Sequence, residues 1–397
     1  MRYAAITERL AGLGGAKWAV HAKAREMKRM GATAAGRDII ELTIGEPDVA
    51  TPPELMALAS KSMLAGRTGY SNGQGEPELL HALAARYTTR RGRQILPSQI
   101  MCFPGTQTTL YAVLMGLLGP GDEVLLGDPM YATYEGLVAA TGAKMVPVPL
   151  LANAGFRIRA EDIADRITPQ SRVIFLNSPH NPTGAVLSRS DFAAIGALAK
   201  AHDLWILCDE VYEDLVFEGV AFASPLDLPD LAERVIVASS ISKSHAAPGF
   251  RSGWCVGPAE FIERLLPLSE TMLFGNQPFI ADMTAQAIAQ GSPVAAGMAE
   301  RFARRADLVR ARLDGVAGLR VHRPDAGMFA LVDVGAVTAD GEAFAMALLE
   351  KAGVAVMPGA SFGVALRSWL RLSLTQTDDL IEEACDRIAG FAAGYQP

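Results

Sequence analysis

Between about residues 101 and 256, short apolar runs alternate with stretches patterned as amphipathic helices. The runs are Glu123–Leu126, Met145–Val148, Val173–Leu176, Leu204–Cys208, Val235–Ala238 and Trp254–Val256. Strands that are apolar on both faces need helices on both sides, so this pattern predicts a mostly parallel sheet between two helical layers. Ligands of such sheets bind at the carboxyl ends of the strands, and functional residues are expected at that edge.

The regions flanking this α/β pattern predict further elements. Thr51-Pro52-Pro53-Glu54 indicates a helix start with Thr51 as the N-cap, and a second helix is expected near Glu78–Arg90. After about residue 280 the pattern changes to a long helical region, then short strands and a last helix. The sequence therefore predicts a large domain and a smaller α+β domain. Their expected ranges are residues 46–285 for the large domain, and 1–45 with 286–397 for the smaller one.

Composition narrows the class of protein. Of the 397 residues, 50% are hydrophobic and 20% are charged, which suits a large buried core, and the net charge of −7 disfavours nucleic acid as a partner. No apolar run approaches the length of a membrane span, and Glu8 and Arg9 interrupt the region where a signal peptide would be apolar. The four cysteines lack the spacing of a metal site. We expect a cytoplasmic protein with neither metal nor membrane.

Lys243 stands in the sequence SSISKSH, directly after the apolar run Val235–Ala238. It should therefore emerge at the carboxyl end of a strand. A lysine surrounded by small residues can lose its charge by desolvation and attack an aldehyde. Taken alone, a lysine in this context is more often an ordinary residue of a surface loop.

Two more strand ends carry polar residues. Asp209 and Tyr212 follow Leu204–Cys208, and Asn181 lies in NSPHNPTG after Val173–Leu176. A carboxylate at this edge either caps the next helix or pairs with a cationic ring nitrogen of a ligand. The prolines and glycine around Asn181 make a rigid turn that can fix the orientation of its amide.

Anion-binding features complete the set. Pro104-Gly105-Thr106-Gln107 opens a helical stretch, and the N-terminus of a helix favours a phosphate, although an ordinary N-cap would look the same. Arg251 lies close enough in sequence to Lys243 to serve the same anion. Arg371 lies inside an apolar strand, where its planar fork either binds a ligand carboxylate or forms a structural ion pair.

In their order, these motifs resemble the fold-type I, class I/II aminotransferases, enzymes that use pyridoxal 5′-phosphate (PLP). The resemblance covers nearly the whole chain. The motifs are LTIGEPD, GYSNGQG, PGTQ, DPMYATYE, NSPHNPTG, CDEVY, SSISKSH, GFRSGW, RPDAGMF and RLSL. It implies the three-layer α/β PLP-transferase fold with a mostly parallel central sheet in the large domain. Several stretches, SKSHA and RPDAGMF among them, look most like bacterial arginine:pyruvate transaminases.

The same resemblance implies a role for each residue. Lys243 would form a Schiff base with PLP, Asp209 would pair with the ring nitrogen, and Tyr212 with Asn181 would bind the phenolic oxygen. Tyr131 would stack on the ring. The phosphate would be held by Gly105, Thr106, Gln107, Ser240, Arg251 and Tyr70 of the partner subunit. The substrate would be held by Gly45, Asn181 and Arg371. Such shared sites imply a homodimer.

The function expected from the resemblance is amino transfer from an L-amino acid to a 2-oxo acid by a ping-pong mechanism. A β-eliminating C–S lyase on the same fold would show the same ring contacts, so it stays an alternative. A PLP-binding regulatory domain of a transcription factor is a further alternative, disfavoured by the acidic charge. His245 stands where such enzymes commonly have an aromatic residue, and its role is open.

Overall fold

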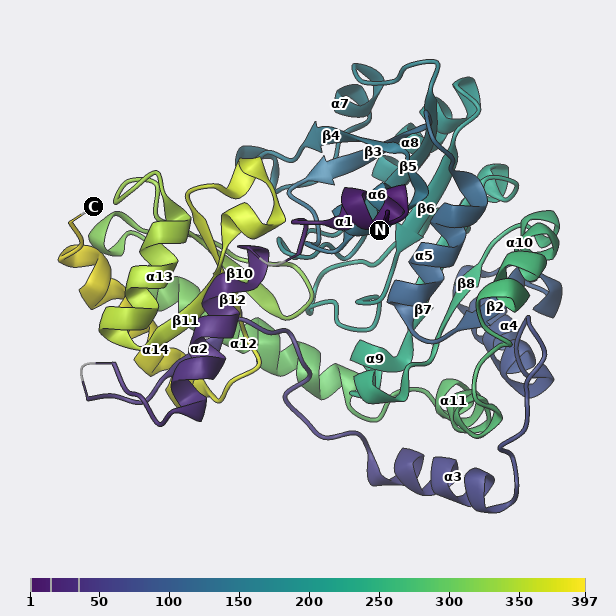
Figure 1. Cartoon of the computed structure of the whole chain (residues 1–397), viewed down its shortest axis with the longest axis horizontal. Coiled ribbons are helices and arrows are strands. Elements are labelled where there is room, and N and C mark those ends of the chain that lie inside the picture. Colours follow the sequence, from purple (N-terminus) through teal and green to yellow (C-terminus); the bar gives the residue numbers. More distant parts are fainter. Residues whose placement is uncertain (1, 15, 35, 397) are drawn as a thin grey trace.

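The computed structural model describes residues 2–14, 16–34 and 36–396, which form two sheets with their covering helices (Figure 1). The larger sheet has the strand order β2-β8-β7-β6-β5-β3-β4. Its strands are β2 (Ile100–Phe103), β3 (Glu123–Asp128), β4 (Lys144–Pro149), β5 (Ser171–Asn177), β6 (Trp205–Asp209), β7 (Val235–Ser240) and β8 (Gly253–Val256). Strands β3 to β7 pair in parallel, and β8 runs antiparallel to β7 and β2. The predicted mostly parallel sheet is confirmed.

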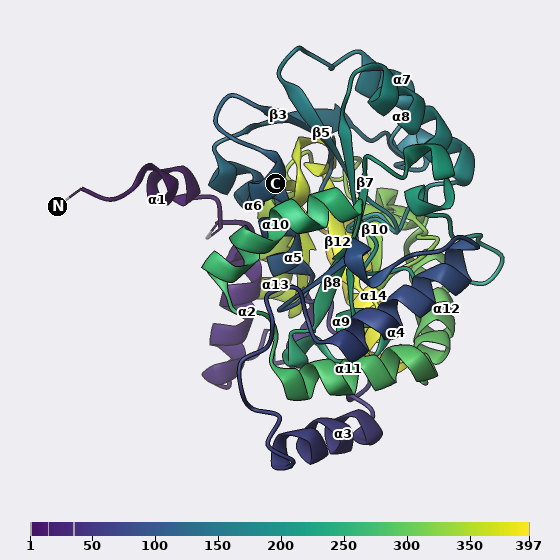
Figure 2. The same ribbon diagram turned by 90° about the vertical axis from the view of Figure 1, so that its right-hand side faces the viewer.

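Side chains of this sheet alternate between two cores, which makes the unit three-layered. On β6, Ile206 and Cys208 belong to one core and Leu207 to the other. The first core is covered by α3 (Pro53–Leu64), α4 (Pro77–Arg91), α7 (Ala160–Ala164), α8 (Arg189–Ala201) and α11 (Pro278–Gln290). The second is covered by α5 (Thr106–Leu117), α6 (Tyr134–Thr141) and α10 (Ala259–Met272). Figure 2 shows α11 lying between α3 and α4. The three-layer α/β expectation is confirmed.

The start of α3 differs from the sequence-based expectation. Its N-cap is Pro52, without a side-chain cap, and not Thr51. The Thr51 hydroxyl donates instead to the carbonyl of Ala246, far along the chain. A hydrogen bond to a distant residue therefore replaces the N-cap bond that the local sequence predicted for the Thr51 side chain.

The smaller sheet has the strand order β1-β11-β12-β10-β9. These strands are β1 (Ile40–Leu42), β9 (Arg320–His322), β10 (Phe329–Asp333), β11 (Val354–Pro358) and β12 (Trp369–Ser373). The helices with them are α2 (Ala19–Arg29), α12 (Ala295–Leu313), α13 (Gly341–Ala352) and α14 (Asp378–Ala393). Residue 40 pairs in parallel with residue 354, so the N-terminal part of the chain joins this sheet. The division into residues 46–285 and 1–45 with 286–397 stays a prediction, and α11 spans its second boundary.

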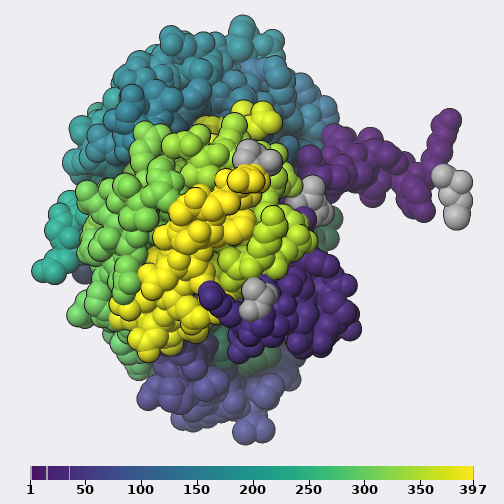
Figure 3. All heavy atoms as spheres, turned by 90° about the vertical axis from the view of Figure 1, so that its left-hand side faces the viewer, coloured from purple at the N-terminus to yellow at the C-terminus, as the bar shows by residue number. Residues whose placement is uncertain are grey.

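The N-terminal segment with α1 (Ala5–Leu10) stands out from the body of the molecule (Figure 3). Helix α1 has no buried residue, and Arg9 fastens it by donating to the carbonyl of Ala139 at the end of α6, 2.8 Å away. Within the described ranges, no helix is both long enough and apolar enough to cross a membrane.

Candidate active site

A cavity of about 230 Å³ lies at the carboxyl ends of β5, β6 and β7. Nearly all the expected site residues line it. They are Gly45, Thr106, Gln107, Tyr131, Asn181, Asp209, Tyr212, Ser240, Lys243, Arg251 and Arg371. Tyr70 is not among them and is 94% exposed, so the structure does not bring it to the cavity of its own chain. The cavity sits where the strand-end rule for parallel sheets predicts a ligand.

Lys243 is carried by α9 (Ile241–Ser244), which follows β7 directly. The hydroxyl of Ser240 caps this helix by accepting from the backbone N–H of Ser242, 3.2 Å away. The Lys243 amine reaches across the cavity and donates to the Gly45 carbonyl at 2.6 Å. Burial lowers the pKa of Lys243 to about 8. About a tenth of its amine is therefore neutral, and nucleophilic, at pH 7, far more than for an ordinary lysine.

Asp209 ends β6 and is buried beneath the cavity. Burial raises the pKa of Asp209 to about 6, while the Tyr134 hydroxyl (2.8 Å) and the Val211 N–H (3.0 Å) donate to the carboxylate and oppose the rise. Tyr134 was missed by sequence reasoning. It stands three residues after Tyr131, and that spacing was the available signal. The Asp209 carboxylate is therefore placed where it can pair with a cationic group of a ligand.

Arg371, on β12, is buried without a carboxylate partner among the described residues. Its Nη1 donates to the Asn181 side-chain oxygen at 3.2 Å and its Nη2 to the Thr43 carbonyl at 2.6 Å. The rings of Phe329 and Phe362 lie 3.9 and 4.5 Å from its guanidinium carbon. Burial lowers the pKa of Arg371 to about 10. A buried cation held by neutral partners favours an anionic ligand, and the structural ion pair considered from sequence is not formed.

The turn that carries Asn181 is fixed by Asn177, a residue that sequence reasoning left without a role. The Asn177 amide donates to the carbonyls of Pro179 (3.0 Å) and Asp209 (2.9 Å), and its oxygen accepts from the backbone N–H of Asn181 (2.8 Å). The bond to Asp209 joins the end of β5 to the end of β6, and the other two hold the turn itself. They set where Asn181 and Asp209 lie relative to each other.

An anion-binding arrangement lies at the N-terminus of α5. Gly105 has a φ of 84°, which residues with a side chain rarely adopt, and an added Cβ would lie 2.2 Å from the Arg251 guanidinium, which would have to move. The Thr106 hydroxyl oxygen is buried and has no hydrogen-bond partner among the described residues. Arg251 donates to the Pro248 and Pro104 carbonyls at 2.8 and 3.3 Å. A helix N-terminus, an unpaired hydroxyl and an arginine together suit a phosphate.

Comparison with known proteins identifies the class. The family model for aminotransferase class I and II matches residues 37–388. The chain belongs to this family, whose members depend on PLP. It is 42% identical to the arginine–pyruvate transaminase of Pseudomonas aeruginosa over 99% of this chain and 98% of that protein.

More distant relatives agree. An aspartate/prephenate aminotransferase of Cereibacter sphaeroides is 36% identical over 95% of each chain. The solved structure of the aspartate aminotransferase of Rhizobium meliloti superposes with a TM-score of 0.91, at 29% identity, over 99% of each chain. The protein is a PLP-dependent transaminase that acts on amino acids, and the C–S lyase alternative is not favoured.

The cavity fits PLP on its own evidence. A nucleophilic amine suits the aldehyde of the cofactor, a buried carboxylate suits its ring nitrogen, and the orphan Thr106 hydroxyl at the start of α5 suits its phosphate. The three residues line the same cavity.

Proposed function

We propose that Lys243 holds the cofactor covalently and moves the proton of the reaction, with Asp209 and Tyr212 as the other catalytic residues. The observation that carries this is the Lys243 amine, which lies inside the cavity with a pKa lowered to about 8. Asp209 would pair with the ring nitrogen. Tyr212 and Asn181 would bind the phenolic oxygen and Tyr131 would stack on the ring.

The phosphate would be held by residues around the start of α5. These are Gly105, Thr106, Gln107, Ser240 and Arg251, joined by Tyr70 of the partner subunit. The homodimer that this requires is part of the proposal. Tyr70 and Phe274, whose rings lie 5.9 Å apart, are 94% and 64% exposed, and α1 buries none of its residues within the chain. Exposed aromatic residues of this kind are favoured at protein interfaces.

In the proposed mechanism, Arg371 and the backbone near Gly45 bind the substrate carboxylate and Asn181 helps to orient it. PLP would supply an electron sink when it is bound. Lys243, as a neutral amine, would accept the Cα proton of the substrate and later donate a proton back. The negatively charged Asp209 would stabilise a positive charge on the ring nitrogen. A 2-oxo acid then accepts the amino group in the second half of a ping-pong cycle.

The donor is proposed to be L-arginine and the acceptor pyruvate. The relative that bears this activity in its name is 42% identical, against 36% and 33% for relatives named for aspartate. The cations that line the cavity are Lys243, Arg251 and Arg371, and each already has a role in the proposal. Among the described residues that line the cavity, this leaves no cation for the second carboxylate of an acidic donor.

Replacing Lys243 with alanine tests the catalytic assignment. The variant should still bind cofactor through the phosphate and ring contacts but should lose turnover by roughly 10⁴-fold or more, since both the covalent link and the base are removed. Cofactor content is measured by absorbance and turnover by 2-oxo acid release. Full activity in Lys243→Ala contradicts the proposal.

A donor screen tests the substrate. Arginine, alanine and aspartate are each paired with pyruvate and with 2-oxoglutarate. We expect kcat/KM to be highest for arginine with pyruvate, by roughly tenfold or more over aspartate. A preference for aspartate with 2-oxoglutarate would contradict the proposed donor and acceptor. Sedimentation would test the dimer, and recovery of activity on mixing Tyr70→Phe chains with Lys243→Ala chains would test the shared site.

We also place the protein in the cytoplasm. Its four cysteines, Cys102, Cys208, Cys255 and Cys385, are free and buried, as in proteins of reducing compartments. Fractionation of the source cells, with antibody detection, checks this.

A further inference from the structure

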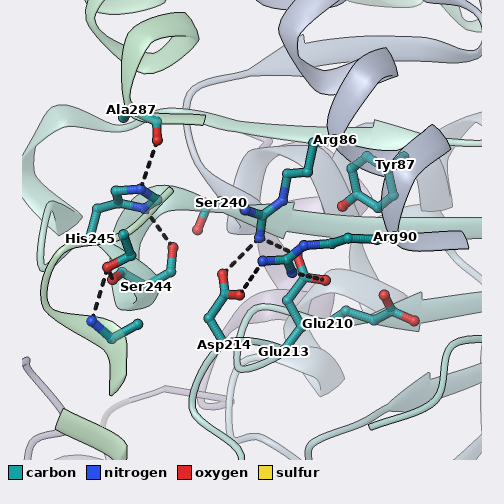
Figure 4. Close-up of polar contacts among 12 residues, drawn as sticks. Arg86, Tyr87, Arg90, Glu210, Glu213, Asp214, Ser240, Ser244, His245 and Ala287 are labelled. Carbon is teal, nitrogen blue, oxygen red and sulfur yellow. Dashed lines mark hydrogen bonds and ion pairs between the residues drawn. The ribbon is translucent and has the colours of Figure 1, made fainter. Parts of the chain in front are cut away.

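His245 is completely buried two residues after Lys243, and the proposed mechanism does not use it. It is the C-cap residue of α9, the short helix that carries Lys243. Figure 4 shows its ring between Ser244 and the carbonyl of Ala287. A buried polar ring at this position must be satisfied by specific partners, and these partners show what it holds together.

The ring of His245 closes the end of a second helix. Its Nε2 lies 3.2 Å from the Ala287 carbonyl. This carbonyl is one of the last four of α11, and the last four carbonyls of a helix have no N–H partner inside that helix. A carbonyl can only accept, so Nε2 carries the proton. Nδ1 is then the acceptor for the Ser244 hydroxyl, 2.8 Å away. The neutral ring thus has both nitrogens occupied.

The contact between the two helix ends is reciprocal. Ser292, two residues beyond α11, donates its hydroxyl to the Ser244 carbonyl at the end of α9. The same Ser292 oxygen accepts from the backbone N–H of Ala295 at 2.9 Å, at the first residue of α12. We call His245 and Ser292 the helix-end clamp. It joins the Lys243 helix, α11 and the start of α12, the long helix that packs with the smaller sheet.

The charges next to the clamp are paired with one another. Arg86 on α4 donates to Asp214 at 2.7 Å and to Glu213 at 3.0 Å, both in the turn that follows Asp209 (Figure 4). Burial lowers the pKa of His245, and Arg86 lowers it further, while Asp214 and the backbone of Ala287 and Gly291 oppose this. The ring therefore stays neutral near pH 7, and its task is hydrogen bonding rather than charge.

The segment just after the clamp adopts a backbone that needs external support. Ala246 has a φ of 50°, in the left-handed region that residues other than glycine rarely adopt. Its carbonyl accepts from the Thr51 hydroxyl. Together with the clamp, this bond fixes the turn by which the chain leaves the Lys243 helix.

We propose that His245 is a positioning residue for Lys243, which acts with Ser292 to lock the Lys243 helix against the ends of α11 and α12. This inference rests on the proposed function of Lys243. Losing the clamp lets α9 shift, so the amine departs from its place opposite Gly45 and Asp209. Small displacements of a catalytic group are costly, whereas binding of the substrate carboxylate at Arg371 is untouched.

The test compares the holoenzymes of His245→Phe and His245→Gln. Phenylalanine keeps a planar ring without a donor, and glutamine keeps an N–H donor at a similar reach. We expect His245→Phe to lower kcat roughly five- to tenfold with little change in KM, as for the loss of one hydrogen bond that acts only on the reacting geometry. The Cα-deuterium isotope effect should rise, and the pH midpoint of cofactor absorbance should shift. His245→Gln should restore all three toward the parent values.

A matched control and a second variant complete the design. His81→Phe removes an exposed ring that also contacts a backbone carbonyl, that of Pro77 at 2.7 Å, and should change nothing. Ser292→Ala should repeat the effect of His245→Phe, and Ser292→Thr, which keeps the hydroxyl, should not. If His245→Phe does not fold, the two Ser292 variants decide by the same readouts.

Three results overturn the positioning role. They are an unchanged kcat and absorbance midpoint in His245→Phe, an equal defect in His245→Gln, and equal behaviour of Ser292→Ala and Ser292→Thr. Lys243→Ala, run beside them, separates the two proposals. If it keeps turnover, the proposed function fails. If it is inactive while the clamp variants behave as the parent, only the positioning role fails.

Discussion

Replacing Arg371 with lysine tests whether the planar guanidinium group of Arg371 binds the substrate carboxylate. Lysine keeps the positive charge between Phe329 and Phe362, but its N–H donors all stand on one nitrogen and lack the planar fork of arginine. The substrate carboxylate would lose one of two charge-assisted hydrogen bonds, and the Thr43 carbonyl and the Asn181 side-chain oxygen would lose their fixed donors. One such bond contributes about 2–3 kcal/mol, so kcat/KM for the amino donor should fall roughly 30- to 150-fold.

The assay is the first half-reaction of the holoenzyme, followed by the absorbance change as the cofactor takes up the amino group. Arginine is compared with agmatine, its analogue without the α-carboxylate. Agmatine should react slowly with both enzymes and at rates within about threefold of each other, because the lost contact is one that it never makes. Arg264→Lys, at an exposed helix position paired with Glu260, is the matched control and should leave both rates unchanged.

An equal loss for arginine and agmatine would refute the carboxylate-binding role and point to a disturbed cavity. Thermal unfolding separates the two cases further. Since Arg371 is buried against two aromatic rings, Arg371→Lys should also lower the unfolding temperature, but the loss of stability acts equally on both substrates. The ratio of the two rates is therefore the decisive quantity.

Three further outcomes follow from the site geometry. Tyr134→Phe removes the hydrogen bond that lowers the pKa of Asp209, so that pKa should rise above about 6. The carboxylate then becomes protonated at a higher pH. On acidification, cofactor affinity, titrated by fluorescence, should therefore fall at a higher pH than in the parent enzyme. Because burial lowers the pKa of Lys243 to about 8, its reaction with an added aldehyde in the apoenzyme should accelerate as pH rises and level off above 8, and a midpoint near 10.5 would contradict this. Gly45→Ala places a Cβ 2.1 Å from the Phe329 ring and should destabilise the fold by about 1–3 kcal/mol in urea unfolding. Gly66→Ala is the comparison, because an added Cβ there meets nothing within 4 Å while φ is +85°. Its loss of stability measures the cost of backbone strain alone.

The sequence predicted the larger sheet well because its strands are apolar on both faces. Val173–Leu176 and Val235–Ala238 lie within β5 and β7, and the polar residues that follow them meet at one edge, as the parallel arrangement requires. Strand β2 was missed, since a run of four residues before a helix carries too little periodicity to identify. The antiparallel pairing of β8 with β2 and β7 was not predicted either, because the direction of a strand depends on the segments that connect it to its neighbours and not on its composition.

By itself the sequence determined which residues to propose for the chemistry, and all four of those named next line the cavity. Lys243, Asp209, Asn181 and Arg371 stand in motifs whose local context, a strand end or an apolar strand, already indicates their environment. Only the tertiary structure decided their partners. Tyr134 on Asp209 and His245 on Ala287 are contacts between residues 75 and 42 positions apart. Burial and hydrogen bonding between distant segments set the pKa and position of a side chain, and no pattern within one segment specifies which distant segment will pack against it.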